Sequence, residues 1–138
     1  MQLSSDAIEH ILDEHAHTAS QVYPTLAGGV VLTAGAAWTL GAFAQIVPAT
    51  TITERFDIHH VCVEGLSANE VYEVVLYYGA TDIECGRVRV VKNANLDGTM
   101  NIPLQTPILP ADSKIRAKVA TAGGGDTATV SIFYHIYD

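Results

Sequence analysis

The sequence predicts an all-β fold: one antiparallel, jelly-roll-like β-sandwich preceded by a short N-terminal helical arm. Hydrophobic side chains alternate with a period of two from about Val30 to the C-terminus, which is typical of half-buried strands. Turn signals rich in Gly, Asn and Asp separate these runs at short intervals. The length of 138 residues fits a single domain. We therefore assign residues 1–29 to the arm and residues 30–138 to the sandwich.

The arm is expected to contain a short amphipathic helix. Asp6 suits the N-cap position, and Glu9 follows three residues later as in a capping box. Apolar residues recur at helical spacing after this start, and Pro24 separates the helix from the sandwich. A helix of about ten residues is marginal alone in water, so it must dock on its own domain or on a neighbour. The residues expected to make these contacts are Ile8, Ile11, Leu12, Asp13, Glu14 and Tyr23.

The strand pattern continues to the end of the chain. Proline interrupts residues 100–110, which predicts an edge strand or an extended connection there. The clearest amphipathic strand turns Ile115, Ala117 and Val119 inward. The last strand is apolar on both faces, so it should lie centrally in a sheet or pack against another subunit. This last strand is residues 127–137, and the other expected strands are residues 36–47, 56–63, 71–78 and 83–91.

Composition and charge limit the classes of partner. Hydrophobic residues make up 49% of the chain and charged residues 16%, which favours contacts between chains and hence a homo-oligomer. The net charge of −8 argues against nucleic-acid binding. All seven Lys and Arg residues lie at or after Arg55, so the leading segment is acidic. That asymmetry indicates either a basic partner surface or ordinary solubility.

Nothing in the sequence predicts a secretory signal or a membrane span. The N-terminus has no basic region followed by an apolar one. Residues 26–47 are uncharged, but their glycines and their alternation suit strands better than a spanning helix. Cys62 and Cys85 are expected to be reduced, buried thiols, with cross-strand neighbours as the alternative.

No residue pattern predicts catalysis, so we expect no enzyme, no catalytic residue, no cofactor and no metal. The chain lacks a G-x-S-x-G nucleophile elbow. His15 and His17 would point the same way in a strand, and copies of this pair could share a metal in an oligomer; a hydrogen-bonded linker is the other reading. His59 and His60 are expected on opposite faces of a strand, which excludes joint chelation. A small hydrolase whose activity depends on His60 is a further functional class that the sequence leaves open.

Several tyrosines fall in the expected strands. Large rings in strands are more often part of a core or an interface than of a ligand site. A carbohydrate-binding face is nevertheless an alternative for them. These residues are Tyr72, Tyr77, Tyr78, Tyr134 and Tyr137.

Most of the chain resembles a family of small virion proteins of tailed bacteriophages, the capsid decoration (cement) and auxiliary head proteins. The resemblance rests on packing and turn residues and on no chemical signature. It lies in residues 15–20 (HAHTAS), 22–26 (VYPTL), 37–43 (AWTLGAF), 46–48 (IVP), 56–59 (FDIH), 65–69 (GLSAN), 72–76 (YEVVL), 106–110 (TPILP) and 124–128 (GGDTA).

The resemblance implies a virion protein, made in the bacterial cytoplasm, that oligomerises on the capsid surface and reinforces a phage head. Its expected partners are copies of itself, as a trimer before a dimer, and the major capsid protein, which the arm would contact. No nucleic acid and no membrane are expected as partners. A collar or tail-associated virion protein with a receptor- or glycan-binding role is the alternative.

Overall fold

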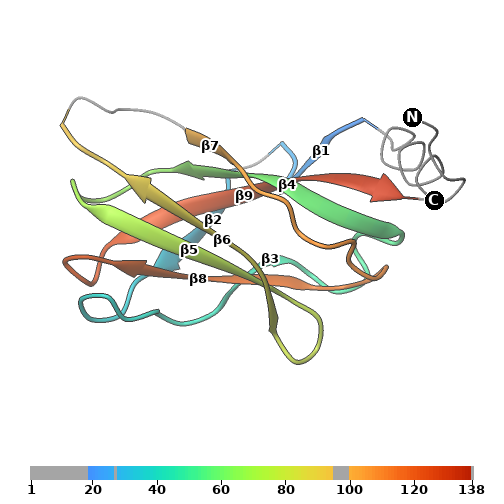
Figure 1. Ribbon diagram of the computed structural model, residues 1–138, viewed down its shortest axis with the longest axis horizontal. Helices are drawn as coiled ribbons and strands as arrows, with labels where there is room; N and C mark the ends of the chain where they lie inside the picture. Colours follow the sequence, from blue (N-terminus) through green and yellow to red (C-terminus); the bar gives the residue numbers. More distant parts are fainter. Residues whose placement is uncertain (1–18, 27, 95–99, 138) are drawn as a thin grey trace, which may run out of the picture.

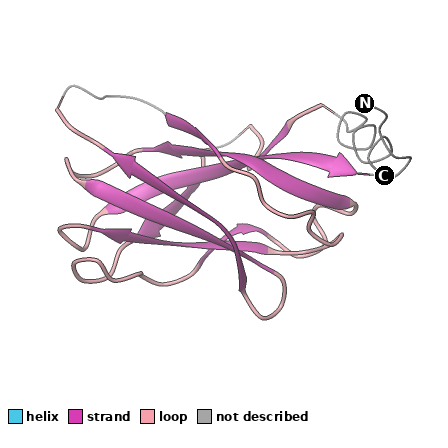
Figure 2. Cartoon of the chain, viewed as in Figure 1, coloured by secondary structure: helices cyan, strands magenta, loops and turns pink. Residues whose placement is uncertain are grey.

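The computed structural model describes residues 19–26, 28–94 and 100–137, and these form two facing antiparallel sheets (Figure 1). Sheet A has the order β1-β9-β4-β7, with β2 also paired to β9, and sheet B has the order β3-β8-β5-β6. The described residues contain strands and loops only (Figure 2), which confirms the predicted all-β class. The predicted arm helix lies outside them. The strands of sheet A are β1 (Gln21–Tyr23), β2 (Val30–Thr33), β4 (Arg55–Glu64), β7 (Met100–Pro103) and β9 (Thr127–Tyr137); those of sheet B are β3 (Ala44–Val47), β5 (Val71–Tyr78), β6 (Ile83–Val91) and β8 (Ile115–Thr121).

The chain passes from one sheet to the other at most of its connections. Only the β5–β6 hairpin joins two neighbouring strands of one sheet directly, within the described ranges. From β2 to β5, and again from β6 to β9, each strand lies in the sheet opposite its predecessor. This winding is the jelly-roll-like arrangement that the sequence predicts.

The core fills the space between the sheets with apolar side chains from both. Phe56 is fully buried, and its ring lies edge-on to Tyr134 with centroids 6.0 Å apart. On β8, Ile115, Ala117 and Val119 are buried as predicted. Burial of each large apolar side chain stabilises the fold by about 1.5–3 kcal/mol, so this interior is the main source of stability.

A β-bulge in β4 changes which side chains face outward. Asp57 pairs with His135 and Ile58 with Tyr134, but the next residue of β9, Phe133, pairs with His60. His59 is therefore the additional residue in β4. Ile58 and Val61 both face the core as a result, and the two neighbouring histidines share the outer face. The expectation that His59 and His60 point to opposite faces is wrong because it assumed an unbroken alternation.

The segment before β3 is also less regular than predicted. Only Ala44–Val47 of the expected strand 36–47 is a strand. Trp38 has a positive φ of 54°, which breaks the alternation. Its N–H donates to the Thr121 carbonyl at 2.8 Å, and the Gly41 N–H donates to the Val119 carbonyl at 3.0 Å. The segment thus runs beside β8 as an irregular edge, held by single hydrogen bonds in place of a ladder.

The ends of sheet A follow the predictions for the last strand and for the proline-rich segment. β9 lies centrally, between β4 on one side and β1 and β2 on the other, and β7 is an edge strand. β1 lies within the residues assigned to the arm, and its Tyr23 pairs with Ile132 and packs against the core. The boundary at residue 29 stays a prediction. Within the described residues, no helix is long and apolar enough to span a membrane.

Replacing the central core ring should destabilise the domain strongly. Phe56→Ala removes a fully buried ring and its contact with Tyr134, so the free energy of unfolding should fall by about 3–5 kcal/mol in urea denaturation. Val31→Ala is the control, because Val31 is 58% exposed and its loss should cost about 0.5 kcal/mol or less. Equal losses in the two variants would contradict the placement of the core.

Candidate functional site

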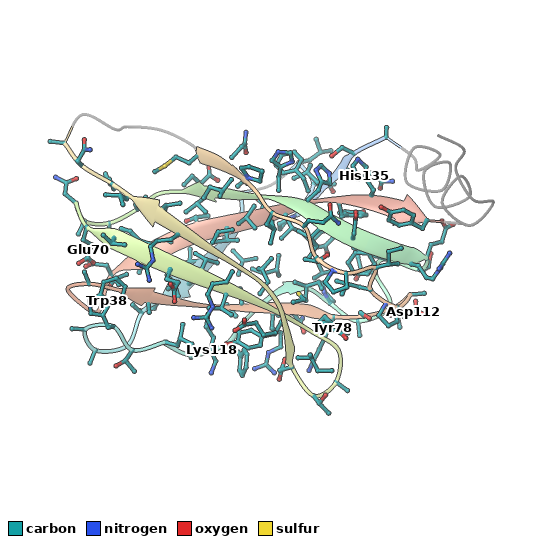
Figure 3. All side chains as sticks on the ribbon, viewed as in Figure 1. Trp38, Glu70, Tyr78, Asp112, Lys118 and His135 are labelled. Atoms are coloured by element: carbon teal, nitrogen blue, oxygen red, sulfur yellow. The ribbon has the colours of Figure 1, made fainter. Side chains whose placement is uncertain are left out.

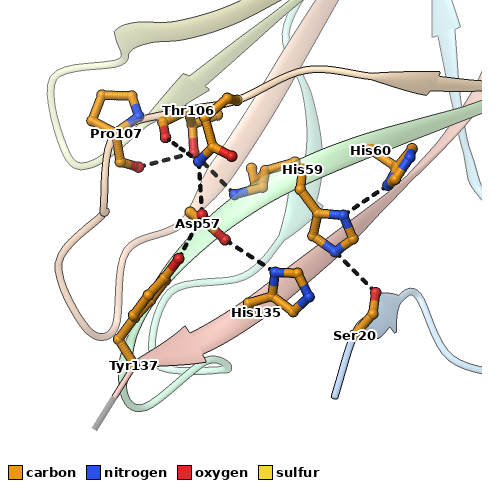
Figure 4. Close-up of polar contacts among 10 residues, drawn as sticks. Ser20, Asp57, His59, His60, Thr106, Pro107, His135 and Tyr137 are labelled. Carbon is orange, nitrogen blue, oxygen red and sulfur yellow. Dashed lines mark hydrogen bonds and ion pairs between the residues drawn. The ribbon is translucent and has the colours of Figure 1, made fainter. Parts of the chain in front are cut away.

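Three histidines gather on the outer face of sheet A, and we call His59, His60 and His135 the histidine cluster (Figure 4). The Nδ1 atoms of His59 and His60 lie 2.7 Å apart in a hydrogen bond. The His59 ring stacks on His135, with centroids 3.9 Å apart and planes 10° apart. Ser20 Oγ is hydrogen-bonded to His59 Nε2 at 2.9 Å. Both ring nitrogens of His59 therefore have polar partners.

A buried carboxylate lies beside the cluster. Asp57 points to the outer side of β4, yet it is only 3% exposed. Its Oδ2 accepts hydrogen bonds from Gln105 Nε2 at 2.7 Å and from the Tyr137 hydroxyl at 2.8 Å. Its Oδ1 lies 3.7 Å from His135 Nδ1. These partners offset the cost of placing a carboxylate out of water.

The segment after β7 covers this carboxylate and is fixed to β4. The Ile58 N–H donates to Thr106 Oγ1 at 2.9 Å, and Thr106 Oγ1 donates to the Pro107 carbonyl. The Thr106 N–H also donates to the Ile58 carbonyl at 3.2 Å. Gln105 is thereby held over Asp57, so the cluster connects segments that are far apart in the sequence (Figure 4).

The histidine cluster has the geometry of a polar contact network. A metal ion lies near the plane of each imidazole that binds it, and the parallel rings of His59 and His135 cannot share one ion in this arrangement. Among the described residues, no group of three or more His, Cys, Asp or Glu could hold a metal. Ser20 and His59 have the spacing of the nucleophile and the base in a catalytic triad. The carboxylate that should orient the base is missing from His59, because its other ring nitrogen bonds His60 and the carboxylate of Asp57 adjoins His135.

The outer face of sheet B carries a second surface, on which cations lie against aromatic rings. We call Trp38, Phe43, Tyr77, Arg89, Arg116 and Lys118 the cation–aromatic face. Figure 3 shows Trp38 and Lys118 along this side of the sandwich, away from His135. Two outward side chains beneath it, Val75 and Ala120, are buried, which shows how closely the layer covers the sheet.

Phe43 is the centre of this face. Its ring meets Tyr77 edge-on with centroids 5.0 Å apart. The Arg116 guanidinium lies 3.9 Å from the Phe43 centroid, and Lys118 Nζ lies 4.0 Å from it. Arg89 lies 5.3 Å from the centroid of Trp38, which is 52% exposed. Such pairs orient the cations while leaving charged groups at the surface.

Carboxylates neutralise most, but not all, of these cations. Glu73 bonds Arg87 at 2.8 Å and Arg89 at 2.7 Å. The hydrogen bond from Arg89 is the main cause of the lowered pKa of the Glu73 carboxyl, although burial opposes it. Asp82 lies 3.4 Å from Arg116. In the described part of the chain, Lys118 has no carboxylate partner, so its charge is available to another molecule.

The structure places the expected contact residues unevenly. Of those expected in the arm, all except Tyr23 lie outside the described residues, and so do His15 and His17. The five tyrosines do not share one face. Tyr72 is fully buried and donates to the Ala68 carbonyl, whereas Tyr137 donates to Asp57 and Tyr77 belongs to the cation–aromatic face. Phe43 and Trp38 are surface residues that the sequence pattern does not reveal, because both fall within one expected strand.

The two cysteines are free, lie in different sheets and are half-buried, so the expectation of fully buried thiols is wrong. Cross-strand pairing is therefore wrong for them. The pKa of the Cys85 thiol is raised to about 12, mainly by burial and in addition by the charge of Glu84. Burial also raises the pKa of the Cys62 thiol, against a lowering hydrogen bond with Ser131. Neither thiol is set up as a nucleophile, since the thiolate is the reactive form.

The similarity to known proteins lies in the fold. No protein-family model matches the sequence, and no curated protein matches it. The structure is similar to infectious bursal disease virus VP2 in a subviral particle (TM-score 0.50, 16% identity, 88% of this chain and 34% of that chain). It is also similar to a CBM36 domain of a xylanase from the hindgut metagenome of Trinervitermes trinervoides (TM-score 0.48, 12% identity, 86% of this chain and 85% of that chain). A third similar structure is a carbohydrate-binding module of Cellvibrio mixtus lichenase 5A (TM-score 0.38, 13% identity, 85% of this chain and 87% of that chain).

Removing the carboxylate beside the histidine cluster should destabilise the protein. Asp57→Ala removes the acceptor that the Gln105 amide and the Tyr137 hydroxyl share, so the free energy of unfolding should fall by about 2–4 kcal/mol. Tyr137→Phe removes one donor only and should cost about 1 kcal/mol. Urea denaturation measures both changes. An Asp57→Ala variant as stable as the unaltered protein would show that this network contributes no stability.

The thiol of Cys85 should react slowly in the folded protein. With its pKa raised to about 12, Cys85 has about a thousandfold less thiolate at pH 8 than an exposed cysteine has. Iodoacetamide labelling of Cys62→Ala, in which Cys85 is the remaining thiol, should be slow in buffer and fast in urea. Cys85→Ala gives the comparison for Cys62. Rapid labelling of folded Cys62→Ala would contradict the burial of this thiol.

Proposed function

We propose that the chain is a structural protein of the virion, a capsid decoration (cement) protein that stabilises the head of a tailed phage. In this role it acts by binding and not as an enzyme. Its partners are other copies of itself and the major capsid protein, and it is located on the capsid surface. The sequence resemblance to decoration proteins motivates this choice.

The observation that carries the proposal is the amount of large apolar side chain left exposed on a sandwich whose core is already filled. These side chains occupy loops and strands of both sheets, and each is at least half exposed. Burying these side chains against other chains would remove their apolar area from water, which favours association. They are Leu26, Val31, Trp38, Ile83, Val91 and Ile108.

The shape of the domain also suits a structural role. The chain winds across both sheets, so segments that are far apart in the sequence pair in ladders such as β4–β9. These ladders would resist separation of the strands. The similar fold of infectious bursal disease virus VP2 in a subviral particle supports the suitability of such a sandwich for a viral shell. On a lattice, many copies turn modest contacts into strong overall attachment.

A collar or tail-associated protein with a glycan- or receptor-binding role is the second candidate, and Trp38 favours it. The Trp38 ring is half exposed. The Trp38 N–H donates to the Thr121 carbonyl, and this hydrogen bond fixes the backbone of the residue at positive φ. An exposed aromatic ring on a fixed loop can stack against a sugar or a peptide side chain. Position on the particle distinguishes the two roles.

Heads that lack the protein should release their DNA at a lower temperature than heads that carry it. Cement proteins stabilise the shell because they bind the assembled state, and mass action then favours that state. The measurement is DNA release on heating, followed by dye fluorescence, for particles with and without the gene product. The decoration role fails if the release temperatures agree and the protein is absent from heads. Immunogold label confined to a vertex or tail would favour the second candidate.

A further inference from the structure

We infer that the cation–aromatic face of sheet B is the docking site for the acidic N-terminal segment, residues 1–18, of a second copy of the chain. The segment would act as a strap between neighbouring subunits. This inference deepens the proposed function, on which it rests, by assigning the arm to a subunit contact. It follows from the charge of the two partners, from the chemistry of the face and from the position at which the described chain begins.

The charges of the two partners are complementary. Residues 1–18 contain Asp6, Glu9, Asp13 and Glu14 and no Lys or Arg. The outer face of sheet B carries Arg87, Arg89, Arg116 and Lys118, four of the seven basic residues in a chain of net charge −8. Because three carboxylates already contact the arginines, Lys118 is the cation left for an incoming acid.

The apolar chemistry matches as well. The helix predicted in the arm places Ile8, Ile11 and Leu12 on one side, next to its acidic residues. The cation–aromatic face offers the rings of Phe43 and Trp38 beside its cations. An amphipathic helix that lies in such a surface buries its apolar side while its carboxylates reach the surrounding cations. A free phosphate or another small anion would use the cations but not the rings.

The chain enters the sandwich on the side opposite this face. Ser20 precedes β1 and bonds His59 on β4, which lies beyond β9 in sheet A. The described chain therefore begins at the outer face of sheet A. To reach its own sheet B face, the arm would have to pass round the edge of two sheets that pack about 10 Å apart, together with their outer side-chain layers.

The length of the arm favours a second copy over the same chain. Asp13 precedes Ser20 by seven residues, which span at most about 24 Å when fully extended. The path around the sheet edge has to cross both sheets and their outer side-chain layers, and any helical residue rises only about 1.5 Å. A neighbouring subunit can instead present its sheet B face to the arm directly. The helix predicted in the arm could then lay its apolar side on that face.

The test uses charge reversal in the full-length protein, with self-association measured by sedimentation velocity. Lys118→Glu should raise the dissociation constant for self-association at least about tenfold, because it places like charges together. Asp13→Lys should weaken association similarly. Arg55→Glu is the matched control: it changes the net charge by the same amount, on sheet A, and should leave association within about threefold of the unaltered protein.

Mixing the two reversed variants separates a strap between subunits from an arm that folds onto its own domain. In a mixture of Lys118→Glu and Asp13→Lys, the intact arm of the first meets the intact face of the second, and the reversed pair is complementary too. Association should rise above that of either variant alone, because two of the three contacts in a mixed trimer, and all contacts in an even-numbered ring, are complementary. Native mass spectrometry with one variant labelled with ¹⁵N should show mixed oligomers. The double variant Lys118→Glu/Asp13→Lys should also recover.

Three outcomes overturn the strap. Reversals without effect exclude this face, and reversals that mixing does not rescue exclude docking between copies. If the unaltered protein is monomeric and the Lys118→Glu variant binds heads less well, the face contacts the shell and not a second copy. Binding to purified heads is measured separately. Normal head binding by a variant that no longer self-associates leaves the decoration role intact, whereas rescued association without head binding would retain the strap and remove the role.

Discussion

One additional residue in β4 determines what each face of sheet A presents. An unbroken alternation from Phe56 would place His60 and Cys62 in the core and would turn Val61 and Val63 toward water. Burying an imidazole without a partner costs several kcal/mol, and exposing two valines forfeits about as much again. The bulge at His59 avoids both costs, since all four apolar residues of this strand then face inward. The core and the outer face of sheet A both depend on this change of register.

The same bulge builds the polar network on the outside of the sheet. It places the His59 ring against His135 and within hydrogen-bonding distance of Ser20, so the start of β1 is fixed to β4 across β9. Asp57 then fixes the segment after β7 through Gln105. Four parts of the chain thus meet at one place by polar contacts, and these contacts add specificity to an interior held mainly by apolar burial.

The regular strands could be predicted from the sequence because alternation is a local property. β8 and β9 were recognised by their side-chain pattern, and proline marked β7 as an edge strand. The bulge could not be recognised in this way, because the residues around His59 read equally well as an unbroken strand, and only pairing with β9 settles the register. Trp38 was misplaced for a similar reason: hydrogen bonds to β8, which are not local, hold its positive φ. The cation–aromatic face combines residues from four distant segments, so it depends on the topology.

The proposed strap joins two different faces of the sandwich, and this limits the symmetry of the oligomer. An arm that leaves over the outer face of sheet A and docks on the outer face of sheet B of the next copy uses two different surfaces, so the contact is heterologous. Contacts of this type generate rings when the rotation closes, and filaments when it does not. A two-fold dimer would instead contain the arm–face contact twice, with each copy giving its arm to the other. Under the proposed decoration role, a ring of three copies joined by such straps would suit the three-fold positions of an icosahedral shell.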